Sequence, residues 1–70
     1  MSTAKQILNF IIKEKSGGNS FHELNVQMKI MMKGLNVKGI LEGNIPDDPV
    51  LFEKLMGIAN EFGVDVANLC

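Results

Sequence analysis

Between residues 3 and 15, apolar side chains recur at intervals of three and four residues, the spacing of one face of an amphipathic helix. The positions are Ala4, Ile7, Leu8, Ile11 and Ile12, with Phe10 widening the stripe. Ser2 or Thr3 is suited to cap the start of this helix, and Gly17 and Gly18 follow its end. We therefore expect a helix over residues 3–15 with one well-buried side.

A second helix is predicted to start at Ser20, because Ser20 and Glu23 have the spacing of a capping box. Two apolar sets follow at helical spacing: a main stripe of Phe21, Leu24, Met28, Met31 and Met32, and a flanking pair, Val26 and Ile30. Flexible methionines fill irregular gaps in cores and are also favoured on surfaces that bind partners. We expect Met28, Met31 and Met32 to pack in the core; if they are exposed instead, they form a predicted partner-binding patch.

Gly34 interrupts this pattern, and residues 35–42 can form a short third helix that ends at Gly43. The alternative is a connecting turn with only a helical segment. The side chains expected to be exposed around this helix are Lys33, Asn36 and Lys38. Asparagine can pair with adenine, and lysine can contact phosphate or guanine, so this segment is a candidate DNA contact.

The loop over residues 43–49 has the composition of a turn, and Asp47 or Asp48 is suited to cap a last helix with Pro49 in its first turn. That helix carries Leu55, Ile58, Ala59 and Phe62 on one face, and Gly63 ends it. Val64, Val66 and Leu69 are then expected to return to the core.

Every apolar run keeps helical spacing, and none alternates over the length of a strand. We therefore predict an all-α fold: a compact bundle of four or five short helices in a single domain over residues 1–70. The predicted core comprises Ile7, Leu8, Ile11, Leu24, Met28, Val37, Ile40, Leu55, Ile58, Ala59 and Phe62.

The stretch over residues 43–69, with its Leu55, Ala59, Gly63 and Val64, resembles the last two helices of the lambda-repressor-like helix-turn-helix family. The resemblance implies that residues 33–42 hold the recognition helix, with Val37 and Ile40 facing inward. The earlier part departs from the family pattern, because Gly34 falls five positions after the expected turn glycine. The departure therefore affects the region that binds DNA in that family.

The composition and motifs of the chain argue against several classes of protein. The single cysteine, Cys70, excludes an internal disulfide, and the chain has neither a signal peptide nor an apolar run long enough for a membrane helix, so we expect a soluble, cytoplasmic protein. The only histidine, His22, lies within the predicted capping box. Because no nucleophile motif, phosphate-binding loop or metal-ligand spacing is present, we predict neither an enzyme nor a cofactor.

Charge is divided along the chain. Residues 1–38 carry six lysines against two acidic residues, whereas residues 39–70 carry one lysine against six acidic residues. A basic half can bind a polyanion or associate with an acidic surface. The chain contains no arginine, the usual bidentate partner of guanine and phosphate, and this argues against sequence-specific recognition of DNA.

Two functions remain open. The first is a small DNA-binding transcriptional regulator, with the basic half on phosphate and segment 33–42 in the major groove. Its predicted DNA contacts are Lys29, Lys33, Asn36 and Lys38. The alternative is a protein-interaction module on the same scaffold that uses the methionine-rich second helix to bind a partner or a second copy of the chain.

Overall fold

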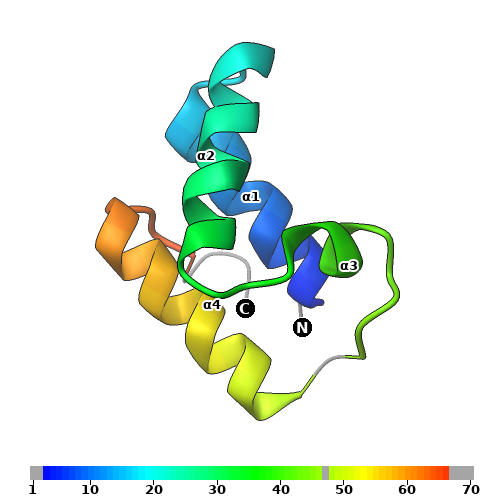
Figure 1. The fold of residues 1–70 in the computed structure, drawn as a ribbon. Coiled ribbons are helices and arrows are strands. Elements are labelled where there is room, and N and C mark those ends of the chain that lie inside the picture. Colours follow the sequence, from blue (N-terminus) through cyan, green and yellow to red (C-terminus); the bar gives the residue numbers. More distant parts are fainter. Residues whose placement is uncertain (1–2, 47, 67–70) are drawn as a thin grey trace.

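Four helices make up the described part of the chain, residues 3–46 and 48–66 of the computed structural model (Figure 1). They are α1 (Ala4–Ser16), α2 (Ser20–Met32), α3 (Val37–Leu41) and α4 (Pro49–Phe62). No strand occurs within these residues. The all-α prediction is confirmed. The third helix is shorter than the predicted span of residues 35–42.

The helix α1 is central to the arrangement, because it contacts each of the other three helices. It forms an antiparallel hairpin with α2, and it also packs against α4, which crosses the lower left of the molecule in Figure 1. One core joins all four helices. Its buried residues are Ala4, Ile7, Leu8, Ile11, Ile12, Val26, Ile30, Leu35, Val37, Ile40, Leu51, Leu55, Ile58, Ala59 and Val66.

Side-chain caps fix where the four helices begin. The hydroxyl of Thr3 accepts a hydrogen bond from the backbone N–H of Gln6, whose side chain accepts from the backbone N–H of Thr3, completing a capping box. The carboxylate of Asp48 accepts from the N–H of Leu51 at 2.8 Å, and Pro49 occupies the first turn of α4. These two caps agree with the sequence analysis; Asp47 lies outside the described residues.

The predicted capping box at Ser20 and Glu23 is wrong. Asn19 is the cap of α2, and its side-chain oxygen accepts from the N–H groups of Phe21 and His22 at 2.9 and 3.2 Å. Asparagine is at least as good a cap as serine. The structure therefore uses the cap one residue earlier, while the helix still begins at Ser20 as expected.

Glycines in the left-handed conformation end α1 and α4, at Gly17 and Gly63. Gly63 has a φ of 71°, and this lets the N–H of Val64 bond to the carbonyl of Ala59 at 2.8 Å. The chain then turns back, so that Val66 is buried and Val64 is half-buried, as predicted. Leu69 and Cys70 lie outside the described residues.

The core prediction is confirmed at eight of its eleven positions, and Phe62 is half-buried against the core rather than inside it. It is wrong at Leu24 and Met28, which are exposed. The flanking pair, Val26 and Ile30, faces α1 instead and is buried. Because only one side of α2 can pack against α1, the larger apolar set points outward.

Candidate functional site

The most unusual surface of the molecule is the outward face of α2. Its five large apolar side chains are exposed by 78%, 60%, 58%, 51% and 85%; they are Phe21, Leu24, Met28, Met31 and Met32, here called the α2 stripe. Single exposed apolar residues are normal on protein surfaces, whereas a contiguous group is typical of an interaction site. The predicted partner-binding residues Met28, Met31 and Met32 all belong to this stripe.

Helical periodicity explains why these five residues form one surface. At about 100° per residue, the stripe lies opposite the direction of Val26 and Ile30, which are 5% and 0% exposed. The helix is thus apolar on two opposite sides, and only one side meets the core.

The spacing within the stripe is that of a coiled-coil seam. Phe21, Leu24, Met28 and Met31 are separated by three, four and three residues, which is the a and d pattern of a coiled-coil seam. The side chains beside this seam are uncharged: Ser20 and Gln27 on one flank and Asn25 on the other. Lys29 lies farther round the helix, beyond Asn25.

At its C-terminal end the stripe adjoins a small charged cluster that the ends of α1, α2 and α4 form together. The Nζ atom of Lys33 lies 2.6 Å from the Oε1 atom of Glu61, and the ammonium groups of Lys33 and Lys15 lie 5.8 and 5.7 Å from the centre of the Phe62 ring. Both distances fall within the range of a cation–π interaction. The cluster ties the end of α2 to the end of α4.

The structure brings only two of the four predicted DNA contacts into one hollow. Lys29 and Lys33 line one shallow hollow with Met32 and Phe62, and Lys38 belongs to α3 instead. Lys29 and Lys38 are exposed, but Lys33 forms the ion pair with Glu61.

Asn36 is used to cap α3. Its side-chain oxygen accepts from the N–H of Gly39 at 3.0 Å. A Cβ atom at Gly39 would lie 2.7 Å from the end of the Ile45 side chain and 2.8 Å from the Asn36 amide nitrogen. The close approach allowed by Gly39 is therefore filled from within the molecule, by Ile45 and Asn36.

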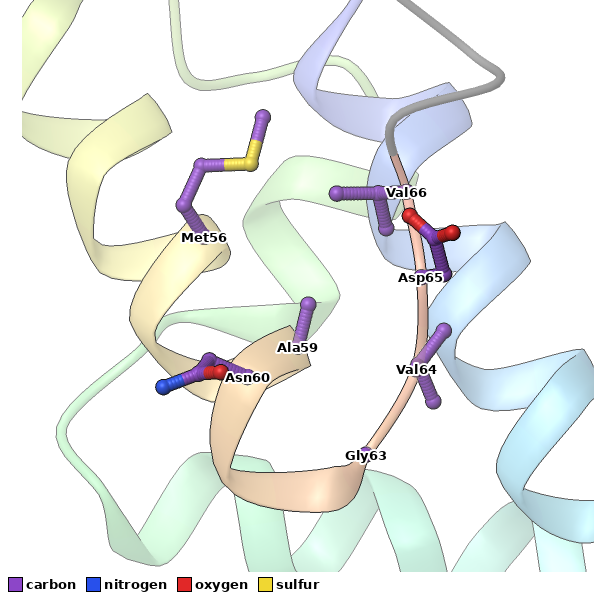
Figure 2. Close-up of a pocket in the computed structure, with 7 residues that line it drawn as sticks. All are labelled: Met56, Ala59, Asn60, Gly63, Val64, Asp65 and Val66. Atoms are coloured by element: carbon purple, nitrogen blue, oxygen red, sulfur yellow. The ribbon is translucent and has the colours of Figure 1, made fainter.

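A second candidate is the hollow between α4 and residues 63–66. Figure 2 shows Met56 and Val66 pointing toward the same space with Ala59 between them, while the amide of Asn60 points away. Its lining is mostly apolar and contains no cluster of polar groups directed at a ligand. The lining of this hollow includes Val66, the last described residue, and we assign no function to the hollow.

Sequence reasoning found the residues of the α2 stripe but placed four of them in the core, Leu24, Met28, Met31 and Met32, which are all exposed. One signal could have indicated the outcome: the apolar residues of segment 20–32 cover opposite sides of a helix. Of the two sets, the β-branched pair Val26 and Ile30 is the stiffer and packs more uniquely than the methionines. The methionine side was therefore the better candidate for the surface.

No protein-family model, curated protein or solved structure matches this chain. None of the helices in the described part of the chain combines the length and apolar composition needed to cross a membrane. Among the same residues, no three histidine, cysteine or acidic side chains are grouped so that they could hold a metal ion.

Proposed function

We propose that this chain is a protein-interaction module and that the α2 stripe is its docking surface. The observation that carries the proposal is the exposure of five large apolar side chains on one helix face, directly opposite the face that meets the core. Three of the five are methionines, whose flexible side chains adapt to the shape of a partner.

The energetics agree with a docking role. Burying one large apolar side chain contributes about 1.5–3 kcal/mol. Three or four such side chains at the centre of an interface are enough to form the cluster of residues that dominates binding. In the isolated chain this contribution is absent, because nothing in the described residues covers Phe21 or Met32.

The second candidate is the DNA-binding regulator of helix-turn-helix type. Its support is the connection between α2 and α3, four residues that include Gly34, which is the form of a helix-turn-helix corner. Against it, α3 has five residues and is only about 7.5 Å long, and Asn36 and Lys33 already have partners within the chain. We therefore rank this candidate second.

One pair of variants tests the first proposal. The stripe variant, Leu24→Glu with Met28→Glu, puts two charges at the centre of the surface. The control, Asn9→Glu with Asn60→Glu, adds the same charge at exposed positions on α1 and α4. We expect an extract of the source cells to contain a protein retained by the wild type and the control but not by the stripe variant.

The DNA candidate is measured on the same proteins by fluorescence anisotropy with a labelled random duplex at low salt. Non-specific binders respond at dissociation constants of about 10⁻⁴ M or below. Binding that is lost in Lys29→Gln with Lys38→Gln but kept in the stripe variant would favour the regulator. Retention of every extract protein by the stripe variant, together with no self-association through α2, would contradict the interaction proposal.

A further inference from the structure

The α2 stripe has a pattern that also identifies its partner. We infer that the stripe pairs with the same stripe of a second copy of this chain, with the two α2 helices antiparallel. This inference rests on the proposed interaction function and specifies the occupant of its docking surface.

The spacing identifies the occupant as a helix. A seam at intervals of three, four and three residues holds side chains that insert between those of a facing helix along its whole length. The helix α2 has 13 residues and is therefore about 20 Å long, enough for nearly two heptads of such packing. An extended peptide would present side chains at a period of two and could not match this seam.

The seam is also its own complement. The intervals three, four, three are the same in either direction, so a reversed copy aligns with the original. In that alignment Leu24 faces Met28 of the other copy, and Phe21 faces its Met31. Such an arrangement has two-fold symmetry, in which each contact occurs twice, as in most homodimers.

Charge permits the pairing of two copies. In coiled coils the positions beside the seam often carry charges that select a partner, but Ser20, Asn25 and Gln27 are uncharged, so two copies do not repel each other there. The charges of Glu23 and Lys29 lie farther round α2, on opposite flanks of the seam, and Lys33 is paired with Glu61.

Glu23 and Lys29 do not select the orientation, because they cannot form an ion pair across the seam and salt screens charges separated by more than about 8 Å. The helix dipoles favour the antiparallel orientation, since each N-terminus would lie beside the C-terminus of the other copy. The formal net charge of the chain is −1, so overall repulsion between two copies is small.

Sedimentation velocity over a concentration series from about 1 µM to about 1 mM covers the range of moderate and weak association. We expect the wild type and the Asn9→Glu, Asn60→Glu control to become dimeric, and the Leu24→Glu, Met28→Glu variant to remain monomeric. Circular dichroism confirms that the variant is folded. A wild type that stays monomeric throughout, or a stripe variant that dimerises equally well, would overturn the inference.

Cross-linking tests the orientation in folded protein and does not depend on the charge variants. With Cys70→Ser as background, Asn25→Cys lies beside its own counterpart in the antiparallel pair, offset by about 3 Å along the helix. Met31→Cys is offset from its counterpart by about 15 Å in that pair but faces it directly in a parallel one. A short bis-maleimide reagent is therefore expected to cross-link Asn25→Cys and not Met31→Cys, and the reverse result would overturn the antiparallel arrangement.

The results separate the two proposals. If the wild type is monomeric but an extract protein depends on the α2 stripe, self-pairing is wrong and the interaction function stands with a different partner. If neither self-association nor an extract protein depends on the stripe, both proposals fail.

Discussion

At the scale of single residues, the contact between Asn36, Gly39 and Ile45 shows how closely the α3 region is packed. The amide of Asn36 reaches over the first turn of α3 to cap it, and the side chain of Ile45 returns from the following loop to the same place. Only the absence of a side chain at Gly39 leaves room for both. The residue therefore has a packing role, which its sequence context alone did not reveal.

The matched substitutions Gly39→Ala and Gly57→Ala test this role. Gly57 lies within α4 with open space around it, so alanine is expected to raise the free energy of unfolding by roughly 0.5–1 kcal/mol. At Gly39, alanine is expected to lower the free energy of unfolding by about 1 kcal/mol. The added methyl group would overpack the site and displace the Asn36 cap, and this loss outweighs the gain in helix propensity. Urea unfolding followed by circular dichroism measures both; an equal gain at the two sites would show that Asn36 and Ile45 move aside freely.

Residue-scale prediction from sequence worked where a single chemical rule applied. The caps Thr3 and Asp48 and the stop at Gly63 each follow from local backbone chemistry, and the structure confirms them. The cap of α2 was missed because two neighbouring residues, Asn19 and Ser20, both satisfy the rule. A local rule cannot choose between adjacent candidates of equal quality.

At the scale of elements, α2 has two apolar faces, of which one packs in the core and the other is exposed. Val26 and Ile30 supply its attachment to α1, and the larger stripe is left outside. Periodicity predicted the helix and both sets of residues, but it gives no information about which set meets α1. That choice depends on the shape of the surface that α1 offers, which is a property of the packed pair.

The two faces of α2 are expected to differ sharply in their effect on stability. Ile30→Ala should cost about 2–5 kcal/mol, because Ile30 is fully buried and its removal leaves a cavity. Leu24→Ala should change the stability of the monomer by no more than about 0.5 kcal/mol, as usual for an exposed site. Thermal unfolding at low protein concentration, where association does not contribute, measures the difference; equal losses would mean that the stripe is packed.

The contact between the ends of α2 and α4 is expected to be weak. The Lys33 and Glu61 side chains are 32% and 59% exposed, so water screens their attraction. A double-mutant cycle with Lys33→Ala and Glu61→Ala should give a coupling of about 0.2–1 kcal/mol that falls at high salt. A larger coupling that is insensitive to salt would indicate that Phe62 holds the Lys33 ammonium in a drier environment than the exposure suggests.

At the scale of the whole molecule, stability depends on α1. It has extensive contacts with each of the other three helices, and Ile7, Leu8 and Ile11 on it are fully buried. A chain of this size has a small margin of stability, because it buries only about 60% of the surface that its unfolded form exposes. Damage to α1 therefore affects its interfaces with all three other helices at once.

Ile11→Ala is expected to remove most of this margin. Its cost of about 2–5 kcal/mol is comparable to the whole stability of a small domain. Proton NMR should show loss of the dispersed amide signals from all four helices together, with Asn9→Ala on the exposed side of α1 as the control. Loss of signals from α1 alone would contradict its central role.

The hairpin of α1 and α2 also determines the order in which the protein can assemble. Its two helices are joined by only three residues, Gly17, Gly18 and Asn19, so closing them requires little loop entropy. The contact of α4 with α1 spans much more of the chain, so we expect it to form later. We therefore expect a newly made chain to pair α1 with α2 first, which leaves the α4-facing side of α1 and the outer side of α2 both uncovered. If the hairpin of a second molecule contacts these surfaces before α4 does, the two chains associate incorrectly. We therefore expect a high protein concentration during refolding to lower the yield of native protein.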